Sequence, residues 1–228
     1  MYNYTNGGVQ TESLKNYAAK TFGWMFLGLA LTFGIMMGAY LTGLVVFFLS
    51  PLAILALTLA EFGTVIVLSR NINKLSVGAA RGLFFLYAIL NGLVFSTLFL
   101  AFDVPALMLA FGVTAVYFGV MSAVGYFTQV DLTALRPILV GGLILLLIFN
   151  VLGMIFGFGG YERLICFAGV AVFLGFTAYD TQKIKAYYAE FEHNPEMLAR
   201  AGIIAALALY LDFVNLFLYI LRLFNGRD

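Results

Sequence analysis

Seven long apolar runs, separated by short polar segments, dominate this chain of 228 residues. A transmembrane helix needs about 20 apolar residues to cross roughly 30 Å of hydrocarbon. The runs are continuous rather than alternating, which favours helices over the strands of a membrane barrel. Spans are predicted at 22–42, 44–68, 80–102, 106–127, 137–158, 164–182 and 202–224. The pattern indicates an all-α integral membrane protein: a polar tail over residues 1–21, then one transmembrane domain over residues 22–228.

Composition supports the same class. Hydrophobic residues make up 63% of the chain and charged residues only 10%, with a mean hydropathy of +1.02, whereas soluble domains carry about 25% charged residues. The lipid bilayer is therefore the expected main partner. A net charge of +1 leaves no basic surface for nucleic acid, and the single cysteine cannot form an internal disulfide. The polar start of the chain does not have the pattern of a cleavable signal peptide.

The basic residues predict the orientation of the spans. Nine lie on the side of the N-terminus, and three lie on the other side. Because cytoplasmic segments are enriched in Lys and Arg, the N-terminus is expected in the cytoplasm, and after seven crossings the C-terminus is expected outside. The chain is compact and lacks retention or transit signals, which favours the inner (cytoplasmic) membrane of a prokaryote.

Small residues recur at four-residue spacing within the predicted spans. This spacing lets two helix backbones approach closely, so these positions are expected at helix–helix contacts. The pairs are Gly34 with Gly38, Gly78 with Gly82, and Gly153 with Gly157.

Four ionisable residues lie within or at the end of the spans: Glu61, Arg70, Asp180 and Asp212. A charge at the bilayer centre costs on the order of 3 kcal/mol even on the mildest scales, so such groups pair, bind a proton or line a wet cavity. At about 1.5 Å per residue, Asp180 and Arg70 are expected near the cytoplasmic boundary. Glu61 and Asp212 are expected together at a deeper level.

The four residues could act as a gate and as a cation site. Two neighbouring carboxylates cannot both ionise easily and titrate as a unit. An ionised cluster of Asp180 and Asp212 could hold Arg70 and draw three helices together, and protonation would loosen it. Carboxylate oxygens suit a hard cation such as Ca²⁺, so Asp180, Asp212 and Glu61 are candidate metal ligands, with Glu61 and Asp212 on the cation pathway. Arg70 as a simple interfacial anchor and Glu61 as a protonated core acid are the alternatives.

Two motifs resemble the signature of the transmembrane Bax inhibitor motif family. They are "AYDTQKI" at 178–184 and "LYLDFVNLF" at 209–217, and the similarity covers the whole membrane portion, as in bacterial Bax inhibitor-like members. The resemblance implies seven helices with the seventh at the centre, surrounded by the other six. It also implies a pH-sensitive Ca²⁺ leak controlled by two aspartates, here Asp180 and Asp212, with a latch arginine at Arg70 and a helix acid at Glu61.

The spacing of the aspartates departs from the family pattern. Asp212 follows Asp180 by 32 residues, which is several more than expected for leak-type members. The extra length falls in "KAYYAEFEHNPEMLARAG". This segment is expected to be either an elongated cytoplasmic helix or an added partner site.

Three functions follow from these features. The first is a pH-sensitive cation leak, with Ca²⁺ as the transported ion and no cofactor. The second is a non-conducting regulator of a membrane-bound protease or stress-response partner, docked on the N-terminal tail or the loop around His193. The third, an intramembrane aspartyl protease, is disfavoured because no glycine precedes Asp212 to admit a substrate backbone. Since no other catalytic motif is present, enzymatic activity is not expected.

Overall fold

The computed structural model describes residues 12–71, 74–156 and 161–225, which contain helices and no strand. Seven helical segments in this part of the chain are long and apolar enough to cross a membrane. The long helices are α1 (Leu14–Leu41), α2 (Pro51–Asn71), α3 (Val77–Phe95), α5 (Val104–Phe127), α6 (Arg136–Phe156), α7 (Glu162–Phe191) and α8 (Pro195–Asn225). The short ones are η1 (Leu44–Leu49), α4 (Leu98–Ala101) and η2 (Leu132–Leu135). The predicted all-α membrane fold is confirmed.

Local signals fix several helix ends. Ser13, Ser76 and Asp103 are N-caps whose side chains accept a hydrogen bond from a backbone amide of the first turn. Helix α2 begins at Pro51 rather than at residue 44, because proline is tolerated in the first turn of a helix but not inside it. The apolar residues before it form η1, which follows Gly43 in a left-handed turn with φ of 74°.

The third predicted span is interrupted near its C-terminal end. Helix α3 ends at Phe95, and α4 continues the span from Leu98. Between them, the hydroxyls of Ser96 and Thr97 donate to the carbonyls of Leu93 (2.6 Å) and Val94 (2.7 Å). Such side-chain bonds compete with the helical hydrogen bonds and favour a break at this point.

Three helices extend beyond the predicted spans at the other end of the molecule. Helix α1 begins at Leu14, so part of the expected tail is helical, and residues 1–11 lie outside the described residues. Helices α7 and α8 leave only a short turn between Phe191 and Pro195 in place of the expected loop. His193 lies in this turn and is exposed. The long sequence separation between the two aspartates is thus explained by the extended ends of α7 and α8.

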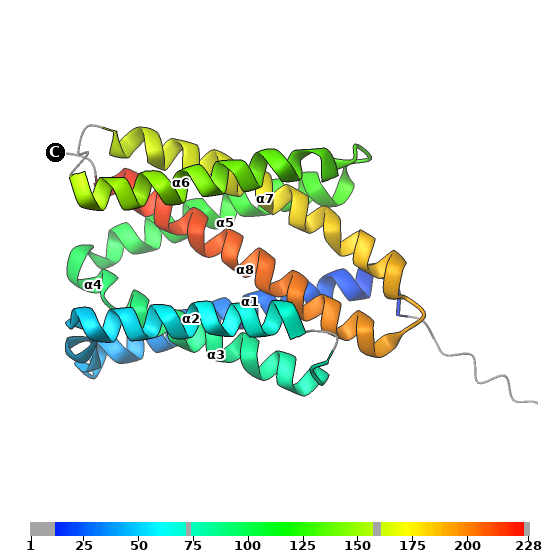
Figure 1. Cartoon of the computed structure of the whole chain (residues 1–228), viewed down its shortest axis with the longest axis horizontal. Helices are drawn as coiled ribbons and strands as arrows, with labels where there is room; N and C mark the ends of the chain where they lie inside the picture. The colour runs from blue at the N-terminus through cyan, green and yellow to red at the C-terminus, as the bar shows by residue number, and fades with distance from the viewer. Residues whose placement is uncertain (1–11, 72–73, 157–160, 226–228) are drawn as a thin grey trace, which may run out of the picture.

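Helix α8 is the central helix of the bundle. In Figure 1 it runs obliquely between α1, α2 and α3 on one side and α5, α6 and α7 on the other. It packs most extensively against α7, and also against α1, α5 and α3. In the most apolar segment of α8, 72% of the residues are buried, against 11% in the corresponding segments of α2 and of the fifth span, which contains α6. The expected arrangement needs one refinement, because α2 and α6 lie on the outside and mainly contact α3 and α7, respectively.

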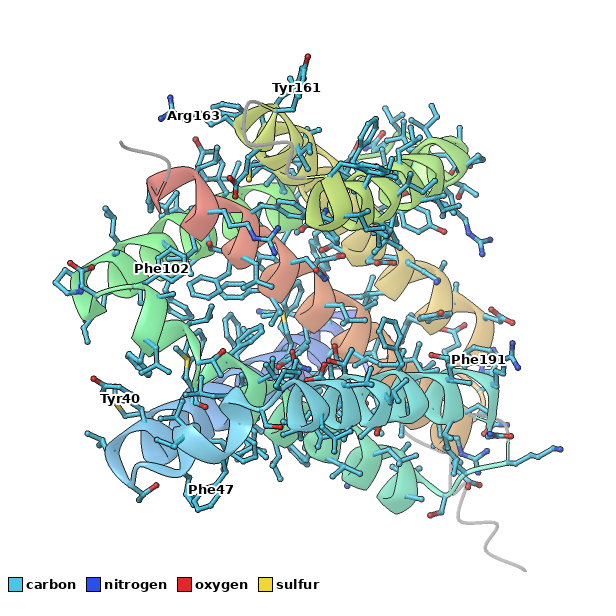
Figure 2. All side chains as sticks on the ribbon, turned by 60° about the vertical axis from the view of Figure 1, so that its left-hand side comes forward. Tyr40, Phe47, Phe102, Tyr161, Arg163 and Phe191 are labelled. Carbon is cyan, nitrogen blue, oxygen red and sulfur yellow. The ribbon has the colours of Figure 1, made fainter. Side chains whose placement is uncertain are left out.

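The outer surface of the bundle is suited to lipid. Large apolar side chains are exposed along the outer helices, for example Leu52 on α2 (75%) and Ile138 on α6 (70%). Figure 2 places Tyr40 and Phe47 at one end of the bundle and Phe191 at the other. Aromatic residues at both ends are typical of membrane–water interfaces.

The closest helix contacts use other glycines than the predicted pairs. A Cβ atom built on Gly125 would lie 2.1 Å from the carbonyl oxygen of Ala178, where α5 meets α7, and one on Gly92 would lie 2.7 Å from that of Thr32 on α1. By contrast, nothing lies within 4 Å of a Cβ built on Gly34 or Gly38. The first two pairs therefore do not mediate helix packing, nor does Gly153, and Gly157 lies outside the described residues.

Candidate functional site

Asp212 lies in the middle of the most buried helix. It follows Pro195, the first residue of α8, by 17 residues, and only 4% of its surface is exposed. Its Oδ2 atom makes no hydrogen bond with any described residue. An ionised carboxylate without a partner is costly in such surroundings. The side chain is therefore a candidate for binding a proton or a cation.

Asp180 lies on α7, the helix that packs along α8, and its side chain is partly buried. It is close enough to Asp212 for its charge to act on that carboxylate through space. Two basic residues attract Asp180: Lys183, one turn later on α7, and Arg136, the first residue of α6. The pair is thus asymmetric, because Asp180 has basic neighbours whereas the charged group acting on Asp212 is Asp180.

Arg70 is not part of this cluster. It is exposed at the end of α2, and α2 packs against α3 and η1 rather than against α7. Among the described residues, the ion pairs within 4 Å are Lys20–Glu12, His193–Glu192 and Arg200–Glu196, and none of them involves Arg70. The expected contact between Arg70 and the aspartates is therefore not formed, and Arg136 occupies the position of basic neighbour instead.

Glu61 belongs to a different polar cluster. It is partly buried on α2, and its charge acts on Tyr87 of α3 and Tyr210 of α8. Its Oε1 atom has no hydrogen-bond partner among the described residues. Within the same part of the chain, no three acidic, histidine or cysteine side chains are grouped so as to hold a metal ion. Glu61, Asp180 and Asp212 thus do not form the expected common metal site.

Tyr210 forms a buried link that the sequence did not predict. Its hydroxyl lies 2.7 Å from Oγ1 of Thr32 on α1, and this threonine also donates to the carbonyl of Ala88 on α3 (2.8 Å). Tyr210 is fully buried and packs edge-on against Phe84 and at a steep angle against Tyr87. Three helices are joined in this way close to Asp212. A tyrosine in an apolar span gives no sign of such a partner, since the threonine is 178 residues away.

Removing the Tyr210 hydroxyl should weaken the bundle modestly. The substitution Tyr210→Phe leaves Thr32 bonded to the Ala88 carbonyl, so the expected loss is about 1 kcal/mol, the net contribution of one hydrogen bond. A lowered melting temperature of the detergent-solubilised protein would measure it. Tyr161→Phe, at an exposed tyrosine, is the matched control and should not change the melting temperature. Equal melting temperatures for the two variants would contradict the role of the link.

Sequence comparisons agree with the geometry. The sequence model of the family described as "Inhibitor of apoptosis-promoting Bax1" matches residues 14–228. The chain belongs to this family. The Bax inhibitor-like protein is 37% identical over 217 residues to the inner membrane protein YbhL of Escherichia coli, covering 94% of this chain and 93% of YbhL. It is 38% identical to a protein of Deinococcus radiodurans (95% and 93% covered) and 36% identical to one of Borreliella burgdorferi (94% of each covered).

Proposed function

We propose that this Bax inhibitor-like protein is a cation leak, with Ca²⁺ as the transported ion, whose opening depends on protonation of Asp180 and Asp212. The observation that carries the proposal is the buried Asp212 carboxylate in the central helix. One of its oxygens has no hydrogen-bond partner among the residues that the structure describes, and the negative charge of Asp180 acts on it. A carboxylate in this position either binds a proton or meets a cation. Both events change the charge at the core of the bundle.

The direction of the pH response follows from the neighbours of Asp180. When Asp180 is ionised, it attracts Lys183 on its own helix and Arg136 at the start of α6, which holds the ends of α6 and α7 together. Protonation removes this attraction, and the helices can separate. The leak is therefore expected to increase as the pH falls.

The orientation is part of the proposal. The ends of α1, α2, α3, α6, α7 and α8 that carry most of the basic residues lie at one end of the bundle (Figure 1). Because basic residues are enriched on the cytoplasmic side, this end faces the cytoplasm, and the chain lies in the inner membrane. The aspartate pair then responds to cytoplasmic pH, and the C-terminus lies outside.

Purified protein in liposomes that enclose a Ca²⁺-sensitive dye tests the proposal. Ca²⁺ entry above that of protein-free liposomes is expected, and it should be faster at about pH 5 than at about pH 8, because the carboxylate pair titrates as a unit. Absence of flux at every pH would overturn the proposal. That result would favour a non-conducting regulator of another membrane protein.

A further inference from the structure

The loop between α5 and α6 is tied to the aspartate-bearing helix by two side chains of α7. Gln182 accepts a hydrogen bond from the amide of Leu132 (2.8 Å) and donates one to the carbonyl of Val130 (2.7 Å). Both ends of its side-chain amide are therefore bonded to the backbone of the same loop. Gln182 follows Asp180 by two residues, so the loop is fixed to α7 next to the carboxylate pair.

Lys185, one turn further along α7, extends the same contact. Its ammonium group donates to the carbonyls of Tyr126 (2.7 Å) and Thr128 (3.2 Å) at the end of α5. The last carbonyls of a helix lack partners within the helix, and a lysine is well suited to bind them. Together with the contact of Gly125 with Ala178, this fixes the end of α5 along about two turns of α7.

The loop is also ordered internally. Oδ1 of Asp131 accepts a hydrogen bond from the amide of Thr133 (2.8 Å), and Oγ1 of Thr128 accepts one from the amide of Val130 (3.2 Å). The hydrogen bonds from Thr133 lower the pKa of the exposed Asp131 carboxyl below its ordinary value, so this bond persists at neutral pH. Because the loop is ordered internally, a displacement of α7 at Gln182 is passed on to α6. Helix α6 starts at Arg136, four residues after Leu132.

We infer that Gln182 is a positioning residue that holds the α5–α6 loop, and with it Arg136, against α7, the helix of Asp180. In the proposed cytoplasmic gate, this loop is the part that moves when the gate opens. The inference rests on the proposed leak function. The charged groups that act on Asp180 are Asp212 from α8, Arg136 from α6 and Lys183 on α7 itself. Arg136 is exposed, so solvent weakens its attraction to Asp180. The hydrogen bonds of Gln182 compensate by fixing the distance between Arg136 and Asp180.

Two measurements separate this role from a merely structural one. The first is amide hydrogen exchange of the segment 128–135 in the full-length protein. Gln182→Ala removes both hydrogen bonds and should speed the exchange of this segment by more than about tenfold, because each bond of ordinary strength contributes roughly a fivefold effect. Gln182→Glu keeps the acceptor for Leu132 and loses only the donor, so it should give an intermediate rate. Gln129→Ala, at an exposed glutamine of the same loop, is the control and should not change the exchange of its neighbours.

The second measurement is the pH profile of Ca²⁺ flux in dye-loaded liposomes. Gln182→Ala and Arg136→Gln should both raise the flux at neutral pH towards the value of the wild-type protein at acid pH. Arg136→Lys should behave as wild type, and so should Arg163→Gln, an exposed arginine at the opposite end of α7.

Each outcome decides a different question. Faster exchange with an unchanged pH profile would overturn the gating role and leave Gln182 as a structural contact. Unchanged exchange would overturn the contact itself. If the wild-type protein shows no flux, the proposed function fails and the gating role fails with it, while the exchange rates still report whether Gln182 holds the loop.

Discussion

Replacing Asp212 with asparagine is expected to shift the pH dependence of Ca²⁺ flux to lower pH. Asparagine has nearly the same shape as aspartate but cannot ionise in this range, so Asp180 becomes the single titrating carboxylate of the pair and no longer faces a neighbouring negative charge. The flux of the variant at neutral pH should be at or below the wild-type value, and its rise on acidification should begin at a lower pH. The dye-loaded liposomes used for the wild-type protein provide the measurement.

The matched control is Asp103→Asn, which makes the same chemical change at an exposed position. Asp103 caps α5 through a hydrogen bond from the amide of Ala106, and asparagine is an equally good cap. This variant should keep both the melting temperature and the pH profile of the wild-type protein. A wild-type pH profile in Asp212→Asn would contradict the role of the aspartate pair.

The stability of Asp212→Asn provides a second test of the same environment. Burying an ionisable group without a hydrogen-bond partner is unfavourable. Oδ2 of Asp212 is buried and has no such partner in the described part of the chain. Asparagine removes the charge without creating a cavity. The variant is therefore expected to melt at or above the temperature of the wild-type protein, so a shifted pH response cannot be attributed to unfolding.

The number of spans and the unusual surroundings of Asp212 could be predicted because both depend on local composition. A run of about 20 apolar residues specifies a transmembrane helix wherever it packs, and a carboxylate inside such a run needs a special environment regardless of its neighbours. Asp212 is indeed in the buried core of α8. The helix ends were less predictable, because η1 and the extended ends of α7 and α8 continue the apolar or helical pattern of their neighbours.

The identity of the basic partner could not be predicted, because depth in the membrane does not determine which helices are neighbours. The sequence places Arg70 and Asp180 at one level, and the C-terminal ends of α2 and α7 do lie towards the same end of the bundle (Figure 1). However, α2 packs against α3, whereas α6 packs against α7. Arg136 therefore acts on Asp180 and Arg70 does not. The same limit applies to Glu61, whose predicted depth is that of Asp212 but whose charge acts on two tyrosines.

Gly125→Ala is expected to be the most destabilising of the glycine substitutions at the α5–α7 contact. The added methyl group would lie 2.1 Å from the carbonyl oxygen of Ala178 and less than 3 Å from its Cα and carbonyl carbon. These are backbone atoms, which cannot move aside as a flexible side chain can. Overpacking of this kind costs about 1–3 kcal/mol, and the rigid neighbour places this site at the upper end. The intrinsic helical preference for alanine, about 1 kcal/mol, offsets only part of the cost.

Gly34→Ala is the matched control, since Gly34 also lies inside a long apolar helix but is exposed, with nothing within 4 Å of the added atom. It should leave the melting temperature in detergent unchanged or raise it, whereas Gly125→Ala should lower it by several degrees. Because Ala178 precedes Asp180 by two residues, a displaced α5 also shifts the loop held by Gln182. Gly125→Ala should therefore alter the pH profile of Ca²⁺ flux as well. Equal melting temperatures for the two variants would mean that α5 and α7 separate at this point without cost, which contradicts the close contact that positions the aspartate pair.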